Sequence, residues 1–390
     1  MTKTTKIAVA TFGRSDYGLL RNLLFEIQRH PELELVVIAA GSHYLDKFGN
    51  SIEEVRGDGH RVVVELDCIS GSTEAGEIVQ DMGRSISEFG RVLSEIQPGL
   101  VLLLGDRFET LTAATSALIL GVPIAHLNGG ELTAGAFDDS IRHAITKMAS
   151  LHFVAEKEYE ARVLQLGEQP DRVHNVGHLG LDSLRALEPM STKDLESLLD
   201  FKLRDVNLLV TVHPETLSSF SPQQLIDSIL GPLGELEEVG IVFTAPNPDP
   251  GHAIISATIR KFVEIHDNAV FVESMGHRAY LSLMLQSKAV VGNSSSGILE
   301  APLAGIPSLN VGGRQTGRIM ATSVHQCDAK PSAVRAALQS VLSSNSGGSP
   351  SLASTPSGHE TVSAKIIRTI KQTNLSELNK KTFNDINIGY

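Results

Sequence analysis

The sequence predicts an α/β protein made of two doubly wound, parallel sheets that face each other across a cleft. Its 390 residues are long for one hydrophobic core and suit two domains. Short apolar runs alternate with amphipathic stretches almost throughout, which is the βαβ pattern. Runs such as VLLLG (101–105) and LVVIAA (35–40) are continuous rather than alternating, as expected for strands covered by helices on both faces.

In the first half, apolar runs predict strands at 6–11, 33–40, 61–66, 100–105, 123–127 and 151–154. Amphipathic stretches between them predict helices at 17–30, 78–96, 109–120, 139–149 and 157–166. The rhythm is lost between Gly177 and Asp194, where Gly, Pro, Ser and Thr accumulate. We therefore expect a first domain of residues 1–182.

The second half repeats the architecture without repeating the sequence. The predicted strands are 207–212, 240–245, 269–272, 289–292 and 308–311. The predicted helices are 222–233, 253–265, 278–286, 297–305 and 331–342. Ser343–Gly358 has the composition of a flexible loop. We expect a second, nucleotide-binding domain of residues 183–358 and a helix at 359–372 within a 359–390 segment that packs back onto the first domain.

Composition excludes several classes of function. A formal charge of -12 argues against nucleic acid or an anionic membrane as a general partner. Cys68 and Cys327, the two cysteines, do not have metal-ligand spacing, so neither a disulfide framework nor a zinc site is expected. Neither a signal peptide nor an 18-residue apolar run is present in the sequence. We expect a soluble, cytoplasmic protein.

Two motifs of the first half place polar residues at predicted strand ends, where ligands bind in open α/β sheets. TFGRSDYG (11–18) puts Arg14 at a glycine-containing strand-to-helix turn, although it is not GxGxxG and could be a plain turn. LLLGDRFE puts Asp106 and Arg107 after a buried strand. The alternative for Asp106 is capping of the next helix.

The segment HLNGGELTAGAFDDSIRHAITK (126–147) is unusually polar for its place after a strand. Glu131 and Asp138 are close in sequence, and neighbouring carboxylates can acquire separated pKa values, as an acid/base pair requires. Asp139 and His143 are i,i+4 neighbours, which favours an ordinary helix-surface ion pair for those two.

In the second half, TVHPET places His213 at a strand end, and TAPNPDPG places Asn247 in a proline-restricted loop. Each could instead have a purely structural role. The strongest phosphate signal is AVVGNSSSGILEAPLAGIP, where Ser294 and Ser295 follow a buried strand at a predicted helix start.

Glu300 and the arginines of a glycine-rich segment follow this predicted phosphate site in the sequence. Glu300 lies in the predicted first turn of the helix and suits a ribose diol, although helix capping alone would explain the serines. GGRQTGR then supplies Arg314 and Arg318, which suit phosphate oxygens unless they form a solvated charge pair.

Taken together and in order, these motifs resemble the hydrolysing UDP-N-acetylglucosamine 2-epimerases of the bacterial sialic-acid or legionaminic-acid branch. The resemblance covers about residues 6–323 and rests on GRSDYG, GDRFE, HLNGGE, DDSIRHAITKMASLHF, VLQLGE, HPET, GNSSSGILEAP and GGRQTGR. It implies two Rossmann-like domains of the glycosyltransferase-B type with a UDP-sugar between them, a homodimer or homotetramer, and neither a cofactor nor a metal.

The resemblance also implies roles for individual residues. The substrate-binding residues would be Arg14, Gly18, Arg107, Asn128, Asn247, Met275, Ser294, Ser295, Glu300 and Arg314. The catalytic residues would be Asp106, Glu131, Asp138 and His213. The chain departs from the family at Asn128, because many members have a catalytic Glu there and an amide cannot be a general base.

The implied chemistry is loss of UDP from C1 with removal of the C2 proton, followed by addition of water to the resulting glycal. The product is a free 2-epimeric sugar, N-acetylmannosamine if the substrate is UDP-N-acetylglucosamine. Three alternatives remain open: the same reaction on UDP-2,4-diacetamido-2,4,6-trideoxyglucose for legionaminic acid, a glycosyltransferase of the same architecture, and a UDP-sugar-binding regulator without turnover.

Overall fold

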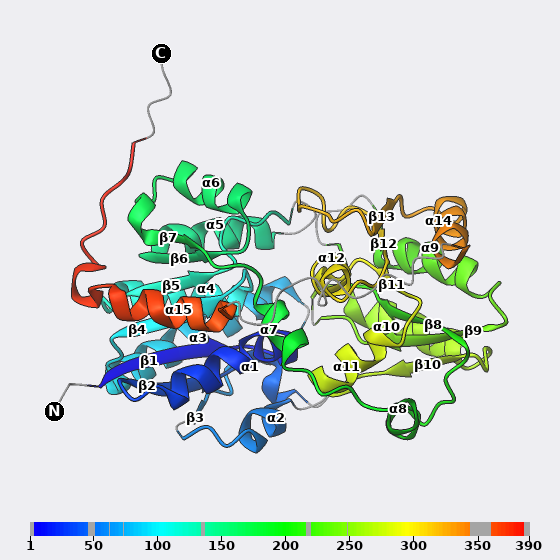
Figure 1. Ribbon diagram of the computed structural model, residues 1–390, viewed down its shortest axis with the longest axis horizontal. Helices are drawn as coiled ribbons and strands as arrows, with labels where there is room; N and C mark the ends of the chain where they lie inside the picture. The colour runs from blue at the N-terminus through cyan, green and yellow to red at the C-terminus, as the bar shows by residue number, and fades with distance from the viewer. Residues whose placement is uncertain are drawn as a thin grey trace, which may run out of the picture.

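The computed structural model describes residues 4–45, 51–61, 63–72, 74–133, 137–215, 220–247, 249–343 and 360–385. They form two α/β halves that lie side by side (Figure 1). Each half contains one sheet whose neighbouring strands all pair in parallel, with helices packed on both faces. The predicted fold class is confirmed.

The first sheet has seven strands in the order β3-β2-β1-β4-β5-β6-β7. They are β1 (Thr5–Thr11), β2 (Leu33–Ala39), β3 (Val63–Glu65), β4 (Leu100–Leu104), β5 (Ile124–Leu127), β6 (Leu151–Val154) and β7 (Val173–Asn175). The order reverses between β1 and β4, and ligands of open α/β sheets bind beyond the carboxyl ends of strands at such a point.

Helices cover both faces of this sheet. They are α1 (Arg14–Arg29), α2 (Ile52–Gly57), α3 (Ala75–Ile96), α4 (Phe108–Ile119), α5 (Asp138–Met148), α6 (Lys157–Gln165) and α7 (Leu179–Arg185). Phe89 of α3, Ala113 of α4 and Ile145 of α5 are buried against one face, and Leu20 and Leu24 of α1 against the other. None of the helices within the described residues is both long and apolar enough to span a membrane.

The second sheet has six strands in the order β10-β9-β8-β11-β12-β13, with a reversal between β8 and β11. The strands are β8 (Val206–Thr211), β9 (Val239–Thr244), β10 (Ala269–Val272), β11 (Ala289–Gly292), β12 (Ser308–Val311) and β13 (Val324–Cys327). The helices are α8 (Thr192–Leu199), α9 (Pro222–Leu233), α10 (His252–Val263), α11 (Gly276–Leu285), α12 (Ser295–Ile298), α13 (Glu300–Leu303) and α14 (Pro331–Ser343).

The last helix, α15 (Val362–Gln372), lies on the first half beside α1 and α7 (Figure 1). Its Ile366 and Ile370 are buried in the same core as α1, and the Asp182 carboxylate accepts the backbone N–H of Ser363 at 2.7 Å. We propose that the domains follow this arrangement: residues 1–182, residues 183–358, and the returning segment 359–390. Ser343 ends α14, and the rest of the predicted flexible loop lies outside the described residues.

Some predicted elements differ from the structure. The helix expected at 297–305 is two short helices, α12 and α13, separated at Leu299. Pro302 explains the break, because it lacks the N–H that a continuous helix would donate to the carbonyl four residues earlier. The segment expected to be irregular, 177–194, contains α7 and the start of α8. The short elements α2, β7 and β13 were not predicted.

Candidate active site

A cavity of about 210 Å³ lies between the two halves, bordered by the carboxyl ends of β4, β8 and β9. It therefore lies beside both reversals of strand order, where two sheets of this type bind ligands. The predicted site residues that line it are Arg14, Asp106, Arg107, Asn128, Glu131, Asp138, His213, Asn247, Ser294, Ser295, Glu300 and Arg314. The structure thus brings together residues from both halves.

Gly18 and Met275 are not among the residues that line the cavity. Gly18 lies where α1 approaches α11, and a Cβ there would be 2.5 Å from Nδ1 of His277. Met275 is buried in the core of the second half, just before α11 begins. Gly18 therefore lies against the lining residue His277, and Met275 directly precedes the lining residue Gly276.

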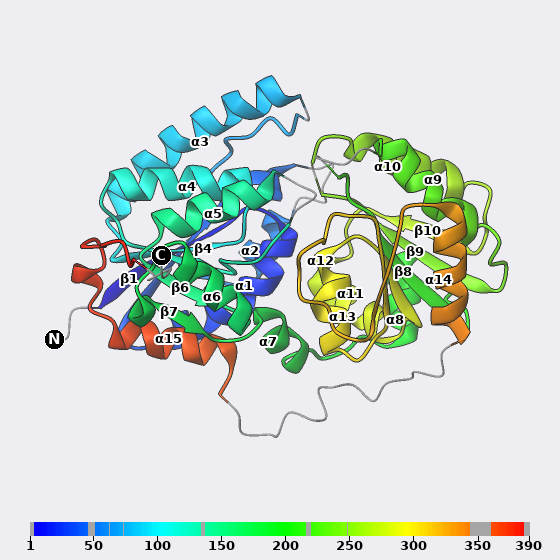
Figure 2. The ribbon, with the colours of Figure 1, turned by 90° about the horizontal axis from the view of Figure 1, so that it is seen from above.

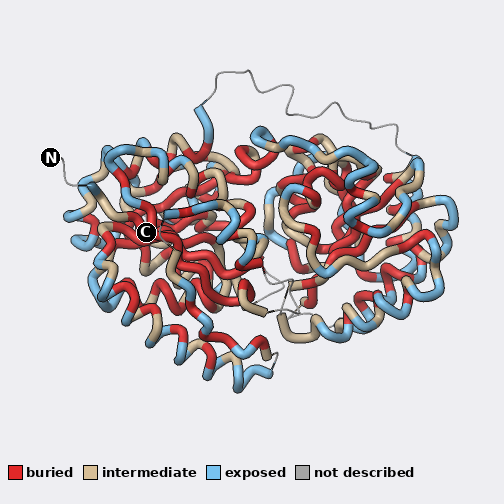
Figure 3. The backbone as a smooth tube through the Cα atoms, turned by 90° about the horizontal axis from the view of Figure 1, so that it is seen from below, coloured by how far each residue is buried: buried red, intermediate tan, exposed pale blue. Residues whose placement is uncertain are grey.

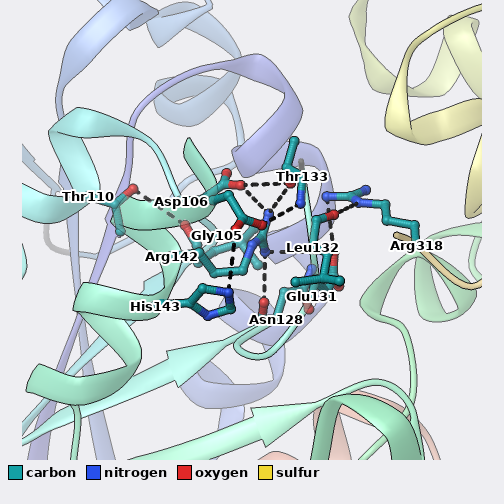
Figure 4. Close-up of polar contacts among 12 residues, drawn as sticks. Gly105, Asp106, Thr110, Asn128, Glu131, Leu132, Thr133, Arg142, His143 and Arg318 are labelled. Atoms are coloured by element: carbon teal, nitrogen blue, oxygen red, sulfur yellow. Dashed lines mark hydrogen bonds and ion pairs between the residues drawn. The ribbon is translucent and has the colours of Figure 1, made fainter. Parts of the chain in front are cut away.

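A network of buried charges forms the end of the cavity on the first half (Figure 4). The Arg142 guanidinium donates to the Asp106 carboxylate and, through Nη1 at 2.8 Å, to the backbone carbonyl of Asn128. The same Nη1 is 3.7 Å from Oε2 of Glu131. The alternative that Asp106 caps helix α4 is wrong. The residue directly before α4 is Arg107, and no side chain caps the N-terminus of this helix.

A second arginine reaches this network from the other half of the molecule (Figure 4). Nη2 of Arg318 is 3.1 Å from Oε2 of Glu131, and its Nε donates to the carbonyl of Leu132 at 3.1 Å. Only 7% of the Arg318 side chain is exposed, so the solvated-pair alternative is wrong for this residue. Among the described residues, Oε1 of Glu131 and Nη1 of Arg318 are buried without a hydrogen-bond partner, which leaves them available to a ligand.

Two aspartates that line the cavity, Asp106 and Asp138, have pKa values that are shifted in opposite directions. Burial tends to raise the pKa of Asp106, but Arg142 and Arg318 hold it below its ordinary value, so this carboxylate is ionised at neutral pH. For Asp138, burial and the negative charges of Asp106 and Asp249 raise the pKa to about 7. A carboxyl group with this pKa can both take and release a proton near neutrality.

Asn128 occupies a left-handed backbone conformation with φ 62° at the end of β5. Asn tolerates this region better than most residues, including Glu. The glycines that follow allow the chain to turn tightly, and a Cβ at Gly130 would lie 2.4 Å from the carbonyl oxygen of Tyr159. The turn holds the Asn128 side chain at the cavity and its carbonyl toward Arg142.

His213 presents a neutral hydrogen-bond donor to the cavity. Its Nδ1 accepts the backbone N–H of Asn247 at 2.9 Å, which leaves the proton on Nε2. Burial, helped by Arg314 and Arg107, lowers its pKa well below the ordinary value. The backbone N–H of His213 donates to the Asn293 side chain at 2.7 Å, which fixes its position. His213 therefore contributes an N–H donor and not a positive charge.

The turn after β11, which contains Ser294, Ser295 and Ser296 and is called the serine turn below, forms the wall opposite the charged network. Gly292 has φ 129°, and a Cβ there would lie 1.9 Å from the carbonyl oxygen of Thr211, so only glycine fits this turn. The backbone N–H of Ser296 donates to Oγ of Ser294 at 3.4 Å. Glu300 follows, with a buried Oε2 that has no partner among the described residues, and burial raises its pKa. This wall offers hydroxyl groups and one carboxyl to a ligand.

Three arginines border the space between these walls. The guanidinium of Arg107 already uses two of its nitrogens within the protein, because Nε and Nη2 donate to the Glu109 carboxylate at 3.2 and 2.9 Å. Arg14 comes from the first half and donates to the carbonyl of Glu273 at 3.2 Å. Arg314 comes from the second half, and its Nη1 is 3.5 Å from the carbonyl of Asn293. Arg14 and Arg314 keep most of their donors for an anion.

Several lining residues were missed as site residues from the sequence. Asp16, whose pKa burial raises to about 6, has a buried Oδ2 without a partner among the described residues. Tyr280 also lines the cavity, and its hydroxyl is 2.5 Å from Oγ of Ser296. Asp16 was within the quoted SDYG motif and could have been considered, whereas nothing in the sequence pattern marks Tyr280.

Comparison with known proteins agrees with the family resemblance that the sequence motifs indicate. A sequence model of the family described as UDP-N-acetylglucosamine 2-epimerase matches residues 25–371. A protein of Campylobacter jejuni named GDP/UDP-N,N'-diacetylbacillosamine 2-epimerase (hydrolyzing) is 36% identical over 320 residues, which cover 82% of this chain and 83% of that protein. Polysialic acid biosynthesis protein P7 of Escherichia coli is 33% identical over 320 residues, covering 82% and 81%.

Among solved structures, the fold resembles the UDP-GlcNAc 2-epimerase of Neisseria meningitidis bound to UDP-GlcNAc, with a TM-score of 0.75. The match covers 95% of this chain and 100% of that chain at 16% identity. At this identity the likeness shows a shared fold.

Proposed function

The chain belongs to the UDP-N-acetylglucosamine 2-epimerase family, and on that premise we propose that it is a hydrolysing epimerase of UDP-N-acetylglucosamine. The products would be UDP and free N-acetylmannosamine, a precursor for sialic-acid-type sugars. The observation that carries the proposal is one cavity with two chemically different walls. Hydroxyls lie on one wall, a carboxyl with a pKa of about 7 lies on the other, and free arginines border the space between them.

The serine wall and the free arginines beside it suit a diphosphate leaving group. Arg14 and Arg314 provide positive charge from the two halves, and His213 provides a neutral N–H. The hydroxyls of Ser294 and Ser295 add further donors. Donors fixed in advance stabilise charge that develops on the leaving oxygen without reorganisation. The unpartnered Glu300 carboxyl suits the hydroxyls of a ribose.

The acidic wall suits the proton transfers. In the first step a base takes the C2 proton while the C1–O bond breaks and its electron pair leaves with UDP, which gives a 1,2-unsaturated glycal. In the second step water adds, with a proton returning to C2 from the other side and hydroxide bonding to C1. Asp138 is our candidate for the base, while Asp106 stays ionised and holds Arg142 in place. Glu131 has a free carboxylate oxygen for the water step.

Removing Arg14 or Arg314 should weaken UDP binding. A hydrogen bond to a charged group contributes about 1.5–3 kcal/mol, so Arg14→Ala and Arg314→Ala should each lose roughly 10- to 100-fold in UDP affinity. Isothermal titration calorimetry measures the loss. Arg335→Ala is the control, because Arg335 is exposed on the second half and pairs with Glu235. Unchanged affinity in both cavity variants would exclude the phosphate assignment.

Asn128 should position the sugar and not transfer a proton. Asn128→Ala should therefore reduce kcat/KM only about tenfold, equivalent to roughly 1.4 kcal/mol of transition-state binding. Asp106→Asn should reduce it much more, because this carboxylate neutralises Arg142 in the network. Both variants need the same UDP-sugar and a prior check of UDP binding. Near-normal activity of Asp106→Asn with complete loss in Asn128→Ala would reverse these roles.

A second candidate substrate is UDP-2,4-diacetamido-2,4,6-trideoxyglucose, because the Campylobacter jejuni relative is named for that type of sugar. The two candidates differ at C4 and C6, away from the bonds that react. Acceptor-free incubation with each nucleotide sugar, followed by measurement of UDP release and of kcat/KM, tests the proposal. Release of UDP and free sugar supports a hydrolysing epimerase, the preferred sugar identifies the substrate, and turnover that requires an added acceptor would indicate a glycosyltransferase.

A further inference from the structure

Each half of the molecule has its own hydrophobic core, so the halves are joined by the contacts that cross between them (Figure 3). After β12, residues 312–319 leave the second half and lie between the two halves (Figure 2). We call these residues the crossing segment. Gly317 has φ 89°, and a Cβ there would lie 2.8 Å from Cδ1 of Leu132, so only glycine allows this close approach to the first half.

The first part of the crossing segment is fixed to the second half. The Glu215 carboxylate accepts the backbone N–H of Gly313 at 2.9 Å and that of Arg314 at 3.1 Å. The buried Gln315 donates through Nε2 to the carbonyl of Asn293 at 2.8 Å. The crossing segment therefore begins from a fixed position beside the serine turn.

The last part of the crossing segment is fixed to the first half (Figure 4). Arg318 donates through Nε to the carbonyl of Leu132 at 3.1 Å, and its Nη2 is 3.1 Å from Oε2 of Glu131. The backbone N–H of Ile319 donates to the Tyr159 hydroxyl at 3.4 Å. The segment thus carries one arginine from the second half to a carboxylate that lines the cavity on the first half.

The orientation of Glu131 depends on this arginine. Only 2% of the Glu131 side chain is exposed, and two guanidinium groups lie near its Oε2, that of Arg318 at 3.1 Å and that of Arg142 at 3.7 Å. The longer distance is beyond that of a hydrogen bond, so within the described residues Arg318 is the closer cation. Because Oε2 is held in this way, the oxygen that remains without a partner among the described residues is Oε1.

We propose that Arg318 is a positioning residue, which reaches from the second half and holds Glu131 of the first half so that Oε1 is presented to the sugar. This role rests on the proposed function, in which Glu131 serves the addition of water. Because the contact joins the two halves, Glu131 is oriented only while they lie together as in this structure. The half that binds the nucleotide therefore also takes part in the proton transfers of the other half.

Arg318→Met should lower kcat about 10- to 100-fold, because a catalytic group displaced by about 1 Å can lose this much activity. UDP affinity, measured by isothermal titration calorimetry, should stay nearly unchanged. Arg318→Lys keeps a positive charge near Oε2 and should recover part of kcat. Arg335→Met is the control, because Arg335 is exposed and pairs with Glu235, and it should change neither quantity. A loss of UDP affinity as large as that expected for Arg314→Ala would show that Arg318 binds phosphate, which would overturn the positioning role.

A double-mutant cycle shows whether Arg318 acts through Glu131. Glu131→Gln should lower kcat by itself, and adding Arg318→Met to it should change kcat by less than about threefold. Losses that multiply would overturn the proposal, because Arg318 would then act on the substrate directly. The same cycle with Arg318→Lys applies if Arg318→Met does not fold.

Failure of the proposed function gives a different result. A wild-type chain that releases no UDP from any nucleotide sugar would overturn that function and not the contact. The cycle is then measured on the thermal unfolding midpoint, which does not depend on turnover. Non-additive changes for Arg318→Lys and Glu131→Gln would support Arg318 as the residue that holds Glu131, and additive changes would overturn it.

Discussion

Asp138→Asn should lower turnover by about 10²–10⁴, the usual range for loss of a general acid or base, while UDP binding is nearly unchanged. The reason is the raised pKa of Asp138, which burial and neighbouring carboxylates bring to about 7. If Asp138 is the base, wild-type kcat/KM should rise with pH through about 7 and then level off. The variant should lose that dependence, and pH profiles from 5.5 to 9 would measure it.

The same shift predicts a change in stability. A carboxyl group whose folded pKa lies above its unfolded pKa is favoured in the protonated form by folding. The cost of ionising Asp138 is therefore absent below the unfolded value and complete above about 7. Asp138→Asn should unfold at higher temperature than wild type at pH 8 but not at pH 4. Asp267→Asn, at a side chain 97% exposed, should change neither property. Wild-type turnover in Asp138→Asn would remove Asp138 from the mechanism.

Arg142→Met should destabilise the fold by about 3–5 kcal/mol at neutral pH. Arg142 is 3% exposed and contacts both Asp106 and Glu131, so its removal leaves two carboxylates without their shared cation. Urea unfolding at pH 7.5 measures the loss. The loss should shrink at low pH, where protonation neutralises the carboxylates.

Two comparisons make the Arg142 prediction specific. Arg335→Met removes an exposed arginine paired with Glu235 and should cost less than about 1 kcal/mol. The double variant Arg142→Met/Asp106→Asn should be more stable than the sum of the two single losses predicts, because it no longer contains an unpaired charge at that position. A loss below about 1 kcal/mol for Arg142→Met, or simple additivity, would show that the network is not a coupled unit.

The strands whose ends form the cavity could be predicted, because each is a continuous apolar run flanked by turn residues. The run before Asp106 became β4, and the run before the serine turn became β11. The position of the polar residues after these runs could then be predicted too, because the carboxyl ends of parallel strands meet at one edge of a sheet. The edge strand β3 lies within the predicted strand 61–66, but two other edge strands were not predicted. β7 has three residues, and β13 reads Val-His-Gln-Cys, with no continuous apolar run.

The electrostatic organisation of the site could not be predicted, because it depends on contacts between distant parts of the chain. Arg142 lies in the polar segment 126–147 with no feature that marks it, and its pairing with Asp106 joins α5 to the turn after β4. Arg318 was expected to be a phosphate ligand or a solvated charge, whereas it reaches Glu131 across the two halves. The neutral state of His213 likewise depends on the backbone N–H of Asn247, whose distance no sequence motif gives.

If the proposed function is correct, the residues of this cavity remove the C2 proton and eliminate UDP without any acceptor. Proton NMR of the reaction with UDP-N-acetylglucosamine in deuterated water tests it most directly. We expect UDP and free N-acetylmannosamine in equal amounts, with deuterium at C2 of the released sugar. Released sugar that keeps its C2 proton and its original configuration, or UDP-sugar that is bound but never consumed, would contradict it.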